Sequence, residues 1–274
     1  MKLPTLAFAS VIAATAGMAH AQTWSASCDN RSGTTFADVI DSSDATQSGY
    51  NIDPSQNFQT LNNLSFPASQ SSAGNSATAG LTVVSRFFGN NPSVRITGFR
   101  SDSNATASAT RVNTNVRAFA NDNTRVCFNL AGASAGSPAI MRLSGSIAVS
   151  GTGTSGQIRL QNPSNADIAN ISTGSLNRVI RFTTNGTYSL TALANTGDLQ
   201  INSGASTQSR SARTIAAFTC IGDYNGSGDI TVQDIFDFLA GYFAGNLAAD
   251  SNASGGNSVQ DIFDFLAVYF TNCI

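Results

Sequence analysis

The feature that most constrains this chain is a duplication near its C-terminus. Residues 233–240 read Gln-Asp-Ile-Phe-Asp-Phe-Leu-Ala, and the same eight residues recur unchanged at 260–267. Each copy follows a twelve-residue stretch rich in Asp, Asn, Ser and Gly, at 223–234 and 250–261. A repeated loop with a repeated following segment predicts two copies of one small unit, which bury their apolar surfaces against each other.

The two twelve-residue stretches match the spacing of a calcium-binding loop. Calcium takes about six to eight oxygen ligands, which such a loop supplies from positions 1, 3, 5, 7 and 12, with glycine at position 6. In the first loop, with Gly228 at the turn, these positions hold Asp223, Asn225, Ser227, Asp229 and Asp234. In the second, with Gly255 at the turn, they hold Asp250, Asn252, Ser254, Gly256 and Asp261.

An amphipathic helix is predicted after each loop. Apolar residues recur at helical spacing, as Ile235, Phe238, Leu239 and Tyr242 in the first copy and as Ile262, Phe265, Leu266 and Tyr269 in the second. Four further aromatic residues widen the apolar surface beyond what two short helices can bury, namely Phe236, Phe243, Phe263 and Phe270. We predict that these four residues bind a partner.

Charge separates this tail from the rest of the chain. From Cys220 onward there are seven Asp and no basic residue, whereas all 13 Arg lie between Arg31 and Arg213. Such an excess of carboxylates is unfavourable unless a cation binds there. The second loop offers two carboxylates against three in the first, so we predict two Ca²⁺ sites, of which the second is weaker. A helical hairpin that binds no metal is the alternative.

The loops, the helices that follow them and the cysteines near both ends of this region resemble the dockerin family, over residues 220–274 only. More narrowly, they look like cysteine-terminated, dockerin-like anchor modules of exported bacterial proteins. The resemblance implies a small α-helical, duplicated EF-hand-like domain and a cohesin-like or envelope protein as partner. The chain departs from the family at position 5 (Ser for Asp), at Asn257, and at the Val-Gln pairs of positions 10 and 11, which puts a standard cohesin in doubt.

The N-terminus predicts export. Residues 1–21 combine Lys2, an apolar run and the small-residue sequence Ala19-His20-Ala21, as in a secretory signal peptide. We therefore expect a secreted, extracellular protein, and attachment to the cell surface is one form of this hypothesis.

Disulfides persist in the extracellular compartment. Of the possible pairings of Cys28, Cys127, Cys220 and Cys273, we favour the first with the second, inside the body, and the third with the fourth, which bracket the tail. Buried free thiols are the alternative.

Residues 22–219 form the body, and their short alternating runs and turn residues predict an all-β domain, either a β-sandwich or a jelly roll. Strands at 81–88 and 94–99 are expected to form one hairpin, and strands at 178–184 and 187–194 a second around Asn185-Gly186. Further strands are expected at 105–120, 125–131, 140–149, 157–160 and 213–218.

Composition limits the chemistry of the body. Without the predicted signal peptide the chain has no Lys or His, and it contains no Glu at all. The Gly-x-Ser-x-Gly match at 132–136 therefore lacks the base that a nucleophilic serine needs. No catalytic residue is predicted, and scattered Arg residues disfavour nucleic acid. We favour a non-catalytic structural or binding protein. The alternatives are a polysaccharide-active hydrolase or lyase and a carbohydrate-binding adhesin, although Trp24, Tyr50 and Tyr188 are more typical of packing than of a sugar platform.

Overall fold

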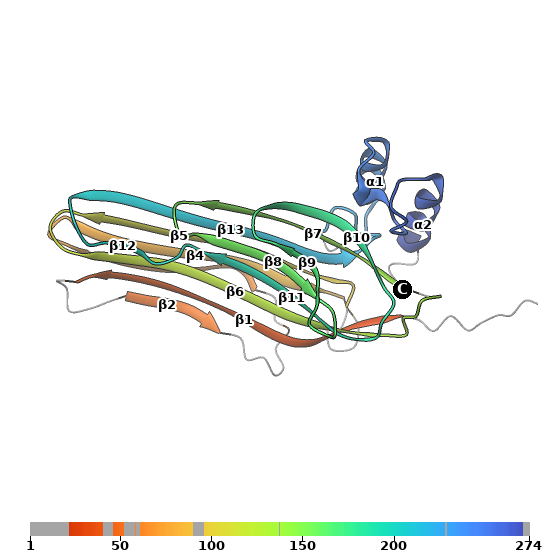
Figure 1. Cartoon of the computed structure of the whole chain (residues 1–274), viewed down its shortest axis with the longest axis horizontal. Coiled ribbons are helices and arrows are strands. Elements are labelled where there is room, and N and C mark those ends of the chain that lie inside the picture. Colours follow the sequence, from red (N-terminus) through yellow and green to blue (C-terminus); the bar gives the residue numbers. More distant parts are fainter. Residues whose placement is uncertain are drawn as a thin grey trace, which may run out of the picture.

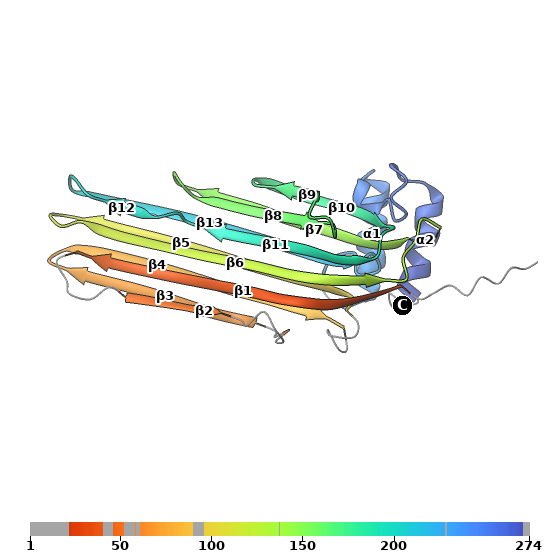
Figure 2. The ribbon, with the colours of Figure 1, turned by 60° about the horizontal axis from the view of Figure 1, so that its bottom comes forward.

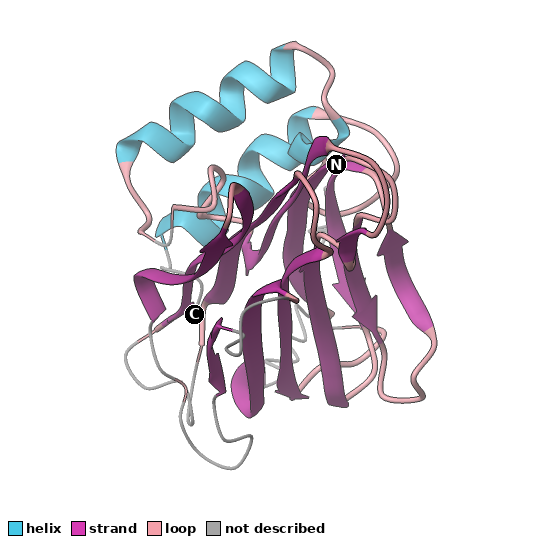
Figure 3. Ribbon diagram, turned by 90° about the vertical axis from the view of Figure 1, so that its left-hand side faces the viewer, coloured by secondary structure: helices cyan, strands magenta, loops and turns pink. Residues whose placement is uncertain are grey.

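The computed structural model describes residues 22–40, 46–51, 58, 61–89, 96–136, 138–227 and 229–270. In this part of the chain, two antiparallel sheets run along an elongated body, and the C-terminal helices lie at one end (Figures 1 and 2). Figure 3 looks along the body from the other end, with the helices behind the strands. The predicted signal peptide, Cys273 and Gly228 lie outside the described residues.

The first sheet has the order β2-β1-β6-β11-β8-β9, with β12 also paired to β6. Its strands are β1 (Thr23–Val39), β2 (Thr46–Asn51), β6 (Val116–Ala131), β8 (Ser155–Gln161), β9 (Asp167–Ile171), β11 (Gly186–Asn195) and β12 (Leu199–Ile201). The 17 residues of β1 correspond to roughly 55 Å at about 3.3 Å per residue. This length explains the elongated outline of the body.

The second sheet has the order β10-β7-β13-β5-β4-β3. Its strands are β3 (Leu61–Ser72), β4 (Asn75–Phe88), β5 (Gly98–Arg111), β7 (Ala139–Ser150), β10 (Gly174–Phe182) and β13 (Ser206–Cys220). The tail then contributes α1 (Val232–Phe243), the 3₁₀ turn η1 (Leu247–Ala249) and α2 (Val259–Phe270). The predicted mainly β, sandwich-like body followed by a small helical region is thus confirmed.

Alternating side chains explain why the sheets face each other. In β4, Ala77, Ala79, Leu81 and Val83 are buried, while Thr78 and Thr82 between them are exposed. An antiparallel sheet with one solvated face shows this alternation. The core has two parts: one is rich in aromatic residues such as Trp24, Phe128 and Phe218, and the other is dominated by Ala. Trp24 and Tyr188 both belong to the aromatic core, in agreement with their predicted packing role.

The pairing of one predicted hairpin is confirmed, although its second strand begins at Gly98 and does not include residues 96 and 97, and the other hairpin is wrong. Phe88 of β4 pairs with Gly98 of β5, so these strands are antiparallel neighbours. In contrast, β10 pairs with β7, whereas β11 pairs with β6 and β8 in the other sheet. Asn185 Oδ1 accepts a hydrogen bond from the backbone N of Ala133 at 2.8 Å, and Gly186 has φ +132°. Asn-Gly therefore allows the chain to cross between sheets instead of folding it back on itself.

The segment predicted as one strand over 105–120 is divided between two sheets. β5 ends at Arg111, and β6 begins at Val116. The side-chain oxygen of Asn75 accepts hydrogen bonds from the backbone N of Val112, Asn113 and Thr114, at 2.8, 3.1 and 3.2 Å. This buried amide satisfies three donors at once, so it stabilises the corner at which the chain changes sheet.

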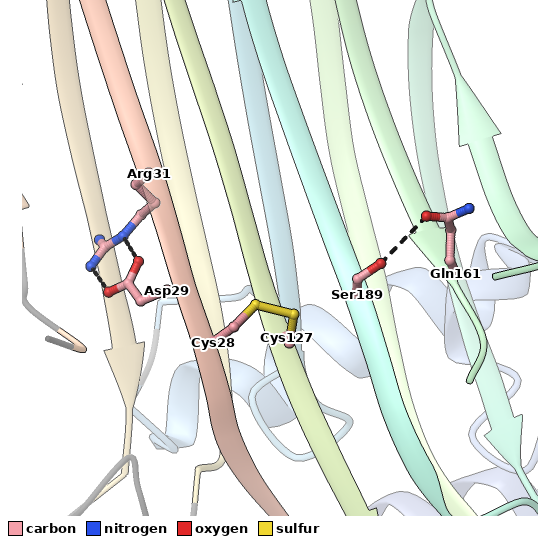
Figure 4. Close-up of a disulfide and its surroundings, with 6 residues drawn as sticks. All are labelled: Cys28, Asp29, Arg31, Cys127, Gln161 and Ser189. Carbon is pink, nitrogen blue, oxygen red and sulfur yellow. Dashed lines mark hydrogen bonds and ion pairs between the residues drawn. A yellow bond between two sulfur atoms is a disulfide. The ribbon is translucent and has the colours of Figure 1, made fainter. Parts of the chain in front are cut away.

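The predicted pairing of Cys28 with Cys127 is confirmed. Their disulfide joins β1 to β6, with 4.7 Å between the Cα atoms, beside a register shift in β1 (Figure 4). One and three residues further along β1, Asp29 and Arg31 form a fully buried ion pair, with 2.5 Å between Oδ2 and Nη2. Cys220 is also disulfide-bonded. Its predicted partner is outside the described residues.

Candidate metal centre

The two repeats share a single aromatic core. Phe238 of α1 and Phe265 of α2 stack with ring centroids 4.1 Å apart and an interplanar angle of 1°. Tyr224, from the first loop, meets both rings edge-on at 5.6 and 6.4 Å. Because corresponding residues of the two copies meet at this stack, the repeats pack against each other as predicted, and each contributes its own loop to one module.

The first loop is organised by a carboxylate at each end. Asp223 and Asp234 are both buried. Asp223 Oδ1 accepts a hydrogen bond from Ser227 N at 2.9 Å, and Asp234 accepts from Asn225 N at 3.1 Å and Thr231 N at 2.8 Å. These backbone donors fold the loop around the two carboxylates. Asp234 also lies in the first turn of α1, where a negative charge stabilises the helix.

The second loop repeats this arrangement residue by residue. Asp250 and Asp261 are buried. Asp250 Oδ1 accepts from Ser254 N at 2.9 Å, while Asp261 accepts from Asn252 N at 3.3 Å and Ser258 N at 2.7 Å. In both loops, therefore, backbone hydrogen bonds of the same kind link position 5 to position 1 and position 3 to position 12.

Position 7 approaches the same cluster through its carbonyl group. The hydroxyl at position 5 donates to that carbonyl in both loops, from Ser227 to Asp229 at 3.1 Å and from Ser254 to Gly256 at 3.3 Å. The Asp229 residue is exposed. In both loops, the backbone carbonyl of position 7 thus lies next to the hydroxyl of position 5.

A second shared network was not predicted from the sequence. In the first repeat, Asp237 accepts hydrogen bonds from the side-chain amides of Asn225, at 3.2 Å, and Gln233, at 2.8 Å. The second repeat forms the same bonds, both at 2.9 Å, among Asn252, Asp264 and Gln260. The signal was present, because an Asp follows position 12 by three residues in both copies. This network orients the amide at position 3 toward the loop.

The loops differ in how fully their polar atoms are satisfied. Asn225 Oδ1 accepts from Ser227 N at 2.9 Å, but the corresponding oxygen of Asn252 is buried and has no hydrogen-bond partner among the described residues. A buried acceptor without a donor is unfavourable, and a cation would satisfy it. Asn257 donates to the carbonyl of Asn246 at 3.0 Å, and its own Oδ1 is likewise buried without a partner in that part of the chain.

The first loop also lies against a cation of the body. Arg142 of β7 is 4% exposed, and its guanidinium carbon lies 3.8 Å from the centroid of the Tyr224 ring. Burial lowers the pKa of Arg142, while contact with Tyr224 and the charges of Asp223 and Asp234 raise it. An arginine remains protonated under these conditions, so a positive charge faces this loop from the body.

The four aromatic residues predicted to bind a partner are exposed. Phe236 and Phe263 are each 62% exposed, and Phe243 and Phe270 are 79% and 75% exposed. Val232 lies four residues before Phe236 on α1, Val259 lies four residues before Phe263 on α2, and both valines are also exposed. Each helix therefore presents an apolar stripe on the side away from the shared Phe238–Phe265 stack.

The donor set fits a hard cation better than a soft one. Each loop assembles two buried carboxylates with amide, hydroxyl and carbonyl oxygens, which are the ligands that Ca²⁺ prefers. Within the residues that the structure describes, no group of three or more His, Cys, Asp or Glu side chains is placed to hold a metal. A cation bound in either loop would need neutral oxygens as well as carboxylates as ligands.

Elsewhere in the described chain, the Gly-x-Ser-x-Gly match lies in a connection between two strands, β6 and β7, not in the turn between strand and helix that a nucleophilic serine requires. No described helix has the length and apolar character needed to cross a bilayer.

Comparison of the chain with protein-family models and with curated proteins gives no match.

Proposed function

We propose that residues 220–274 form a dockerin-like module that binds one calcium ion in each loop and tethers the exported β body to a partner. The partner class is a cohesin-like or cell-surface protein. In this proposal the body is a non-catalytic structural or binding domain. The proposal extends to secretion, since a disulfide such as Cys28–Cys127 persists in an oxidising compartment.

The observation that carries this proposal is the duplicated carboxylate pair. Asp234, Asp250 and Asp261 are buried, and the hydrogen bonds that they accept come from backbone amides and hydroxyl groups, which are neutral. An ionised carboxylate is costly to bury without a compensating positive charge. In the first loop, the guanidinium of Arg142 interacts with two buried carboxylates, Asp223 and Asp234, so this one charge offsets theirs only in part. A divalent cation in each loop would provide that charge, and metal binding would then stabilise the folded module.

The ligand assignment follows from the positions that the loops bring together. In the first loop, Asp223, Asn225, Ser227 and Asp234 would bind through side-chain oxygens and Asp229 through its carbonyl. In the second, the corresponding residues are Asp250, Asn252, Ser254, Asp261 and Gly256. The buried side-chain oxygen of Asn252 has no hydrogen-bond partner in the described part of the chain, which supports the second site in particular, because an oxygen at position 3 is an expected ligand.

The exposed stripes support the tethering role. Apolar side chains on a helix surface that the body does not cover are typical of a protein interaction site. Phe236, Phe243, Phe263 and Phe270 occur at equivalent places on α1 and α2, so the two repeats would present equivalent surfaces to the partner.

Calorimetric titration of the full secreted chain with Ca²⁺ tests the metal sites. We expect two bound ions, one ion in Asp234→Asn and one ion in Asp261→Asn, because each change removes the carboxylate at position 12. Asp198→Asn is the control: its carboxylate pairs with Arg117 in the body, so both ions should remain. A wild-type chain that binds no calcium would remove the basis of the proposal.

A further inference from the structure

Arginines of the second sheet contact the candidate metal loops from the body side. They come from four different strands, and each donates a hydrogen bond to a backbone carbonyl of a loop. In the first loop, the pairs are Arg86 with Ser227, Arg100 with Gly226 at 3.0 Å, and Arg142 with Tyr224. In the second loop, the pair is Arg181 with Asn252 at 3.2 Å.

The three arginines around the first loop are neighbours across the sheet. Arg86 of β4 is directly opposite Arg100 of β5. Strand β13 lies between β5 and β7: its residue Ala217 pairs with Arg100, and its residue Thr219, two positions further on, pairs with Arg142 of β7. Like charges in opposite positions on adjacent strands are destabilising. Their placement is favourable only if they face electron-rich groups, and the carbonyls of the first loop supply these groups.

The arginine contacts and the carboxylate cluster use the same residue. Ser227 donates its backbone N–H to Asp223 Oδ1, on the metal side of the loop, and accepts from Arg86 through its carbonyl, on the body side. Gly226, which accepts from Arg100, precedes it directly. Contacts that order residues 226 and 227 on the body side therefore also order the hydrogen bond of Ser227 to Asp223 on the metal side.

We propose that Arg86, Arg100 and Arg142 make the first loop a calcium-dependent joint between the body and the module, a proposal that rests on the proposed calcium sites. Calcium orders residues 223–227 in the geometry that the arginines bind, and the arginines in turn hold the loop ready for calcium. Two ligands that favour one conformation strengthen each other reciprocally. The second loop, which has one exposed arginine contact among the described residues, takes little part in this coupling.

The test uses the full secreted chain with Asp261→Asn, which leaves only the first site. Into this background we introduce Arg86→Gln and Arg100→Gln together, because both side chains are only partly buried, and leave the buried Arg142 in place. We expect a calcium affinity about tenfold lower, because the variant loses two hydrogen bonds from charged donors that order the loop, and this loss outweighs the removed repulsion between calcium and the two guanidinium charges. Hydrogen exchange of the amides at 223–227 should also become faster with calcium bound.

Arg210→Gln is the matched control. Arg210 lies at the other end of β13, and its guanidinium donates to the carbonyl of Asp198 at 3.1 Å, so this change should alter neither readout. Unchanged affinity and exchange in the double variant would overturn the joint while the calcium sites stand. Absence of calcium binding in the Asp261→Asn chain, with the arginines intact, would instead count against the proposed first site and against the joint with it.

Discussion

The two loops of the C-terminal module have closely similar internal structures and different surroundings. The carboxylates at positions 1 and 12 are buried in both, and the same backbone donors bind them. Three arginines of the body contact the first loop, and one contacts the second. A duplicated sequence thus fixes the local geometry of each loop, while the body to which the module is attached makes the two loops unequal.

The second loop also contains less well satisfied polar groups. Position 8 is Ile230 in the first loop and Asn257 in the second. The side-chain oxygens of Asn252 and Asn257 are buried and have no hydrogen-bond partner among the described residues. Each such atom is unfavourable, so the second loop should be the less stable of the two without its metal.

The largest expected effect tests whether the loops belong to one folded unit. Replacing Phe238 or Phe265 by Ala should destabilise the module by about 3–5 kcal/mol, because each change removes half of a fully buried ring stack. Both variants should weaken calcium binding at both loops. Denaturant titration followed by helical circular dichroism, together with calorimetry, would measure these effects.

Asp198→Asn, which changes an ion pair of the body, is again the control: it should leave calcium binding at both loops unchanged. If Phe265→Ala abolished calcium binding at the second loop alone, the two repeats would be independent, and the comparison between them would have to be made loop by loop.

The sequence predicts the parts of this structure that depend on neighbours along the chain. Alternation in β4 and the helical periodicity of the tail concern residues a few positions apart, and these two predictions are confirmed as a strand and as two helices. The loop spacing is equally local, and the calcium sites that it predicts stay a prediction. Asp237 could have been included as well, since its partners Gln233 and Asn225 are close in sequence. The Cys28–Cys127 pairing was predicted because both cysteines lie in the body, whereas the other two bracket the tail, and it is confirmed.

Apart from this disulfide, the following contacts between distant residues could not be predicted from the sequence. Asn185-Gly186 permits either a hairpin or a crossing, and the choice depends on Ala133, which is 52 positions away. Arg86 and Ser227 are 141 positions apart, and no local pattern marks Arg86 as different from the other arginines. The joint between body and module follows from the fold of the whole chain.

An intermediate effect tests whether carboxylate count makes the second site weaker. Gly256→Asp gives position 7 of the second loop the residue found in the first. A Cβ atom would meet nothing within 4 Å at either Gly255 or Gly256, but only Gly255 has a positive φ, of +104°, which favours glycine. We expect the affinity of the second site to rise roughly three- to tenfold, because added charge tunes calcium affinity.

Calorimetry of Gly256→Asp in the Asp234→Asn background would isolate the second site, and Gly256→Asn would separate charge from side-chain volume. If Asp and Asn raised the affinity equally, charge would not explain the difference between the loops, and the unsatisfied amides of Asn252 and Asn257 would become the better explanation.

The smallest effect on stability belongs to the exposed stripes. Phe243→Ala and Phe270→Ala should each change the free energy of unfolding by less than about 0.5 kcal/mol, because both side chains are largely exposed. If the stripes bind the tethering partner, the same variants should reduce retention of the chain on the envelope fraction of the producing cell, in buffer with calcium. Chelator should release the wild type. A variant that retains full binding would exclude its own stripe from the interface, and a difference between the two variants would show which repeat the partner contacts.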